Sequence, residues 1–285
     1  MFDKVSRAFS LLGPCWRVLM LDKELLLFPV MSAIALVAVL VGGFIPLKEA
    51  GILDALTQNT GDGQQVDQQI LYMVLALGFY FACYFVIIFF NAALIGCALI
   101  RFSGGNPTIA DGFRLSIKNL PQIATWALLT ATVGVLLQLL ESRLEGLAKL
   151  LTGLLGAAWS VATYFAVPIL VVDGVGPTEA LKRSVEAIRK TWGESLVSHV
   201  GFGVLSMFAT IVVLPVFLLV GQLAPTSPEL AMGLVAMAII WIVLANLVIS
   251  TLSAIMRAAL YIYAVEGEVP DQFDSQLMRN AFVHT

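Results

Sequence analysis

Charge is scarce in this sequence. Only 12% of the residues are Asp, Glu, Lys or Arg, whereas 59% are hydrophobic and the mean hydropathy is +0.93. A soluble domain has about a quarter charged residues and about half apolar ones. This balance therefore excludes an ordinary soluble domain and predicts a polytopic membrane protein.

Cysteine and histidine are also rare, with three and two residues respectively. Cys83 and Cys97 are expected on one helix, about 21 Å apart at about 1.5 Å per residue, which is beyond the reach of a disulfide. We therefore expect free, mostly buried thiols. Because the sequence has no Cys-x-x-Cys and no paired histidines, we expect no metal and no cofactor.

The sequence lacks the motifs of common enzyme classes. His199 is close to Ser195 and Ser198, but on a helix these residues are strung along one element and do not face each other across a site. No His-Glu-x-x-His, Gly-x-Ser-x-Gly or phosphate-binding glycine loop is present. Basic residues are interleaved with acids, which disfavours a nucleic-acid partner. We expect a protein that is not an enzyme.

Long hydrophobic runs are what the sequence has in place of these features. A run of about 20 apolar residues crosses a bilayer, and such spans must be helical because lipid offers the backbone no hydrogen-bond partner. Six candidates occur: Leu25–Leu47, Gln69–Ile100, Leu120–Leu140, Leu150–Val172, Ser195–Leu223 and Leu230–Val265. The chain is therefore predicted to be all-α.

Lysine and arginine gather on one side of these spans. Twelve of them lie before the first span, in segments 101–119 and 173–194, or in the C-terminal tail, and only three lie on the other side. Positively charged flanks stay in the cytoplasm. Both termini are therefore predicted to be cytoplasmic.

A Gly-x-x-Pro phrase occurs three times, each time at the predicted cytoplasmic end of a span: Gly104–Pro107, Gly174–Pro177 and Gly267–Pro270. Glycine ends a helix readily, and proline suits the first turn of the next one. An amphipathic segment with apolar residues at three-and-four spacing follows the first two copies, and we expect Phe113, Ile117, Val185 and Ile188 to face inward. The tail repeats the pattern more weakly.

These joints divide the chain into three transmembrane hairpins with amphipathic in-plane helices on the cytoplasmic side. The predicted hairpin repeats are 1–104, 105–174 and 175–267, followed by a C-terminal amphipathic cap, 268–285, all within one transmembrane domain. A simpler interpretation also stands, since any chain that re-enters a membrane needs a helix breaker and basic residues.

Two stretches carry a resemblance to a known family: "CWRVLMLDKELLLFPVMS" (Cys15–Ser32) and "YAVEGEVPDQFDSQLMRNAF" (Tyr263–Phe282). With the six spans, they resemble an uncharacterised prokaryotic family of six-span integral membrane proteins, domain of unknown function family 6159. The resemblance implies a prokaryotic cytoplasmic (inner) membrane location. It implies no catalytic residue and no substrate.

Arg257 is the one charge placed well inside a span. It lies ten residues before Gly267, as Tyr164 lies ten before Gly174, so the two are expected at equal depth. Pro168 frees the carbonyl of Tyr164, which Arg257 could bond, with Asn91 as a second neighbour. This intramembrane polar cluster is the candidate site, although Arg257 could instead extend to the lipid headgroups.

The sequence favours a non-enzymatic membrane protein that acts as a scaffold, assembly or envelope-maintenance factor. Its expected partners are membrane lipids and a protein partner or a second copy of the chain. The alternative is a channel or transporter for a small or amphiphilic solute, which the absence of mid-depth acidic residues in the spans disfavours. Convergence of polar span residues on a cavity would favour transport, and scatter would favour a scaffold.

Overall fold

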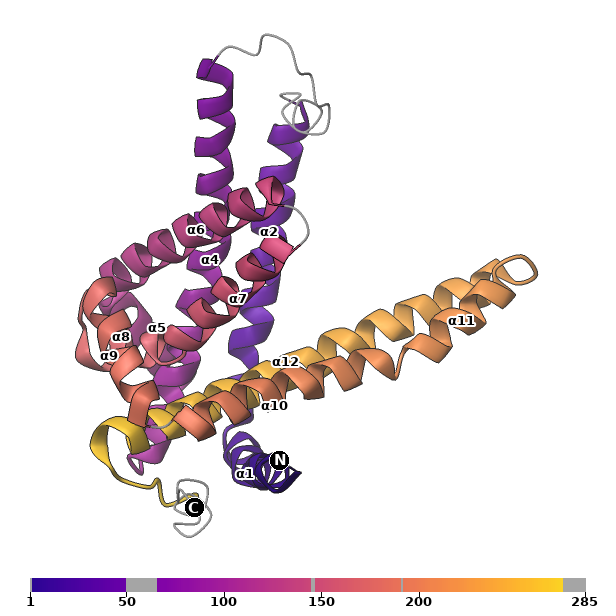
Figure 1. The fold of residues 1–285 in the computed structure, drawn as a ribbon. Coiled ribbons are helices and arrows are strands. Elements are labelled where there is room, and N and C mark those ends of the chain that lie inside the picture. The colour runs from indigo at the N-terminus through magenta and orange to yellow at the C-terminus, as the bar shows by residue number, and fades with distance from the viewer. Residues whose placement is uncertain (1, 50–65, 145–146, 191, 274–285) are drawn as a thin grey trace. The chain divides into compact units, whose positions relative to one another are not determined.

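The computed structural model of the chain describes residues 2–49, 66–144, 147–190 and 192–273 (Figure 1). The described residues form helices and connections without any strand. The predicted amphipathic cap, apart from its first six residues, and most of the connection between the first two spans, residues 48–69, lie outside them.

Six apolar helical stretches are long enough to cross a membrane, which confirms the all-α prediction of six spans. They are carried by α2 (Leu27–Glu49), α4 (Val66–Phe102), α6 (Leu120–Arg143), α7 (Leu147–Ala162) with α8 (Ala166–Asp173), α10 (Trp192–Ile211) with α11 (Leu214–Leu223), and α12 (Pro228–Glu266). Successive stretches pair as three hairpins. A helix at the N-terminus, α1 (Phe2–Leu21), and the 3-10 turn η1 (Lys23–Leu26) precede the first of them.

Proline interrupts two of the spans. The α7–α8 break covers residues 163–165 and precedes Pro168, while the α10–α11 break covers residues 212–213 and precedes Pro215. A proline has no N–H to donate to the carbonyl four residues back, and its ring crowds that carbonyl. Each break is therefore explained by the proline that follows it.

The three Gly-x-x-Pro glycines have left-handed backbone conformations. Gly104, Gly174 and Gly267 have φ values of 80°, 61° and 74°, and no other described residue has a positive φ. The helices α5 (Ile109–Lys118) and α9 (Pro177–Lys190) follow the first two glycines. The predicted stop and restart is thus confirmed at these two joints. After Gly267, residues 268–273 form no helix.

The chain separates into two compact units. The first contains Met1–Pro29, Cys97–Ile109 and Ala187–Thr285, and the second contains Val30–Gly96 and Ala110–Glu186. The largest fully buried side chains of the first unit are Leu25, Phe28, Ile255, Met256, Leu260 and Tyr261. Those of the second are Ile95, Ile123, Phe165, Ile169 and Leu170. The division into hairpin repeats stays a prediction.

The buried face of α5 differs from the predicted one, whereas that of α9 agrees with the prediction in part. On α5 the buried residues are Gly112 and Ser116, whereas Ile117 is 60% exposed. On α9 Ala180, Ser184 and Ala187 are buried beside Ile188, and Val185 is only partly buried. The prediction that Ile117 faces inward is therefore wrong, because the buried residues of α5 are the small Gly112 and Ser116.

Candidate functional site

The three residues of the predicted polar cluster belong to different compact units. Arg257 lies on α12 in the first unit and is partly buried. Asn91 lies on α4, and Tyr164 lies in the α7–α8 break, both in the second unit. The ring of Tyr164 meets that of Phe165 edge-on, with centroids 4.9 Å apart. Because Arg257 belongs to a different unit from Asn91 and Tyr164, the cluster stays a prediction.

Substitution of Arg257 tests the cluster. If Arg257 bonds a backbone carbonyl inside the protein, Arg257→Leu should lower the free energy of unfolding by about 1 kcal/mol or more, because a buried acceptor loses its donor. Arg257→Lys should restore only part of that loss, since lysine lacks the planar fork of donors. Thermal unfolding in detergent measures both. Equal stability of the two variants and the parent would instead mean that Arg257 extends to the headgroups.

A buried ion pair in the first unit joins Asp22 to Arg101. Asp22 lies between α1 and η1, and Arg101 lies in the last turn of α4. The guanidinium donates from Nε and Nη2 to the two carboxylate oxygens of Asp22, which is a bidentate arrangement. The side chain of Arg101 is only 18% exposed, and that of Asp22 is only 7% exposed. The pair therefore ties the N-terminal helix to the end of the second span.

Arg101 also connects two of the glycine joints. Its Nη2 donates to Oδ1 of Asn106, 2.7 Å away in the first Gly-x-x-Pro phrase. Its backbone carbonyl accepts from Nε2 of Gln272 at 3.4 Å, just after the third phrase. The rings of Phe102 and Phe273 meet beside it, with centroids 5.8 Å apart. We call this group of residues, with Asp22, the Arg101 junction.

In the second unit, α9 supplies a hydrogen-bond acceptor to the broken span. The N–H of Phe165 lies in the break and donates to Oγ of Ser184 at 3.1 Å. Both residues are fully buried. Because Phe165 has no helical carbonyl to bond at this point, the serine supplies the acceptor that a dry environment requires.

The helix α5 uses a buried serine in a similar way. Oγ of Ser116 donates to the carbonyl of Phe89 on α4 at 3.0 Å. Phe113, on the same helix, places its ring against those of Phe89 and Phe90, at centroid distances of 6.1 and 5.9 Å. Both short helices are therefore fastened to spans by one buried hydroxyl each.

Two amides at the start of α6 cap the end of α8. Nδ2 of Asn119 donates to the carbonyl of Val171 at 3.2 Å, and Nε2 of Gln122 donates to that of Gly174 at 3.2 Å. The last carbonyls of a helix have no partner within the helix. These two bonds satisfy them from a neighbouring element and fix the joint at Gly174.

Arg183 on α9 is paired with two carboxylates. Nη1 of Arg183 donates to Asp173 and its Nε donates to Glu179, each at 2.8 Å. The hydrogen bond from Arg183 lowers the pKa of Glu179 below its usual range, so Glu179 stays ionised at neutral pH. In the first unit, burial raises the pKa of the Cys15 thiol, which keeps it neutral. None of Cys15, Cys83 and Cys97 forms a disulfide, and Cys15 and Cys97 are buried, as predicted.

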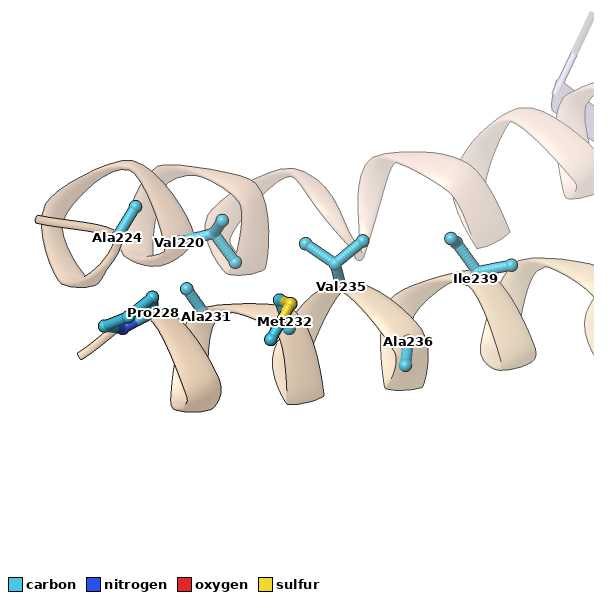
Figure 2. Close-up of a pocket in the computed structure, with 8 residues that line it drawn as sticks. All are labelled: Val220, Ala224, Pro228, Ala231, Met232, Val235, Ala236 and Ile239. Carbon is cyan, nitrogen blue, oxygen red and sulfur yellow. The ribbon is translucent and has the colours of Figure 1, made fainter.

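An apolar groove of about 440 Å³ lies between α11 and α12 (Figure 2). It is lined by Val220, Ala224, Pro228, Ala231, Met232, Val235, Ala236 and Ile239. All of these side chains are apolar, so the groove suits an apolar group. Among the described residues, no group of three His, Cys, Asp or Glu side chains is placed to hold a metal ion.

Sequence reasoning missed the Arg101 junction and the two buried serines. From the sequence, Arg101 was counted only among the positive charges at the end of a span. Asp22 was noted only as part of the stretch that resembles the family. The available signal was the position of Arg101, three residues before the first left-handed glycine. The two serines gave a weaker signal, since they interrupt the otherwise apolar helical spacing on α5 and α9.

Comparison with known proteins agrees with the resemblance read from the sequence. The family described as "Family of unknown function (DUF6159)" matches residues 70–270, which is more than half of the chain. A search of curated proteins finds no match. The matched region runs from α4 to Pro270 of the third Gly-x-x-Pro phrase. With its six apolar helices, the chain is a membrane protein of the DUF6159 family, a family of unknown function.

Proposed function

We propose that this protein is a non-enzymatic scaffold, assembly or envelope-maintenance factor of the prokaryotic cytoplasmic membrane that contacts lipid. In this proposal both termini are cytoplasmic, following the excess of lysine and arginine on that side. Its partners are membrane lipids and a protein, either a different chain or a second copy.

The supporting observation is that two pairs of polar side chains in the spans are bonded at separate places. In the second unit, Oη of Tyr80 donates to Oε1 of Gln138 at 2.6 Å. In the first unit, Oγ of Ser206 donates to Oδ1 of Asn246 at 2.7 Å. A transport pathway needs polar groups that converge on a cavity. The groove of Figure 2 is instead entirely apolar.

A channel or transporter is the second candidate, and the two broken spans favour it. Interrupted helices expose backbone carbonyls and N–H groups, which transporters use to bind solutes at mid-membrane. At the α7–α8 break, however, the N–H of Phe165 is already bonded to Ser184. Because Ser184 already bonds this backbone N–H, the N–H is not available to a solute, which favours the scaffold over the transporter.

Reconstitution and co-purification together test the proposal. In vesicles loaded with potassium and with the anionic dye carboxyfluorescein, the protein should release neither faster than protein-free vesicles do. After mild detergent extraction, it should retain a partner protein at a fixed ratio, whereas an unrelated six-span membrane protein, purified identically, should not. Solute release above the protein-free rate would favour transport, and a monomer without any enriched partner would contradict the scaffold.

A further inference from the structure

The short helix α5 exposes large apolar side chains next to charges. Ile117 is 60% exposed, and Leu120, at the start of α6, is 40% exposed. The opposite face of α5 is packed through Gly112 and Ser116. We call the corner formed by Arg114, Ile117, Lys118 and Leu120 the α5–α6 elbow. Its apolar side chains need a neighbour other than water.

The exposed apolar surface continues from the elbow along a span. On α6, Leu128 and Leu136 are exposed, as are Leu139 and Leu140 near its far end. This helix is apolar and long enough to cross the membrane, so its exposed leucines face acyl chains in a bilayer. Ile117 and Leu120 lie at the edge of that surface, where the hydrocarbon gives way to headgroups.

Two cations flank the apolar residues of the elbow. Lys118 is exposed and forms no ion pair with any described residue. The side chain of Arg114 is 79% exposed, and its guanidinium reaches Asp111 only at 3.5 Å. Basic residues just outside the hydrocarbon attract anionic headgroups. The apolar side chains thus match the acyl chains of an anionic phospholipid, and the basic side chains match its headgroup.

The helix α9 provides a contrast within the same fold. It also follows a Gly-x-x-Pro joint and is also fastened by a buried serine. Yet on α9 Arg183 is held by Asp173 and Glu179, and no large apolar side chain is exposed beside the exposed cations Lys182 and Arg189. The combination of exposed cations and exposed large apolar side chains therefore occurs on α5 and not on α9, although both helices follow the same kind of joint.

We propose that the α5–α6 elbow binds an anionic phospholipid of the adjacent leaflet. Arg114 and Lys118 bond the lipid phosphate, while Ile117 and Leu120 pack against the upper parts of its acyl chains. This inference rests on the lipid contact in the proposed function and names the lipid class and the residues. It does not depend on whether the protein acts as a scaffold or as a transporter.

Fluorescence quenching in vesicles tests the elbow. The full chain, with Cys83→Ala to remove the half-exposed thiol, carries a fluorophore on Ala110→Cys, an exposed α5 position next to the site. Phosphatidylcholine vesicles contain a few mole per cent of a nitroxide lipid with either a phosphatidylglycerol or a phosphatidylcholine headgroup. We expect quenching by the anionic lipid to be about threefold stronger, and the double variant Arg114→Gln/Lys118→Gln to bring the ratio close to one.

The matched control carries the label on Thr178→Cys of α9. Its ratio of quenching by the two lipids should be near one, both without and with the double variant Lys182→Gln/Arg189→Gln. Equal quenching by both lipids at Ala110→Cys would overturn the headgroup site and leave the lipid contact intact. Quenching by neither would overturn the lipid contact of the proposed function as well. Loss of the preference on adding inorganic phosphate at constant ionic strength would mean a site for free phosphate and would overturn the lipid assignment.

Discussion

Replacing Arg101 by leucine is expected to lower the free energy of unfolding by about 3 kcal/mol or more, because it leaves a buried carboxylate without its partner. Asp22 is only 7% exposed and receives both of its charge-assisted bonds from this one guanidinium. Asp22→Leu should cost a similar amount for the reciprocal reason. Thermal unfolding in detergent, followed by the loss of the monodisperse peak, measures both variants.

The double variant Asp22→Leu/Arg101→Leu distinguishes the ion pair from simple packing. Removing both charges leaves no unpaired group, so it should be less destabilised than either single variant. Lys182→Leu, which removes an exposed cation from α9, is the control and should change stability by no more than about 0.5 kcal/mol. Additive losses in the double variant would mean that the two side chains do not act as a pair.

The consequence of losing the pair should be local to the Arg101 junction. Asn106 and Gln272 are both bonded to Arg101, one through its side chain and one through its carbonyl. In Arg101→Leu the side-chain bond to Asn106 is lost, while that from Gln272 to the backbone carbonyl can persist. Hydrogen exchange should therefore rise in the segment 103–108 more than at Gln272.

The elements of this fold could be predicted from sequence because each depends on a local signal. Six spans follow from long apolar runs, and the breaks and joints follow from Pro168, Pro215 and the three glycines. Such signals act over one or two helical turns. Even the left-handed glycines at Gly104 and Gly174 lie where the Gly-x-x-Pro phrase ends a helix.

The partners of buried polar groups could not be predicted in the same way. Asp22 and Arg101 are separated by 79 positions, and no local pattern relates residues so far apart. The packed face of α5 was misassigned for a different reason. Beside a bilayer, large apolar residues such as Ile117 can face lipid, while small ones such as Ser116 and Gly112 allow close packing. Hydrophobic spacing alone does not separate these two environments.

Ser184→Val is expected to destabilise the protein by about 2 kcal/mol, because the buried N–H of Phe165 would lose its acceptor. Valine has nearly the shape of serine with one added methyl group, so most of the loss should come from the missing hydrogen bond. Ser184→Thr keeps the oxygen and is the control for the added methyl group, and it should lose less.

Hydrogen exchange at the α7–α8 break gives a readout that a general loss of packing would not give. The amide of Phe165 should exchange faster in Ser184→Val than in Ser184→Thr, while amides of α6 remain protected in both. This pattern is expected because α8 begins at Ala166, one residue after the bonded N–H, and the serine is the acceptor that α9 supplies there. If Phe165 exchanges equally in the two variants, α9 packs against the broken span without stabilising its backbone, and the break stays open to another partner.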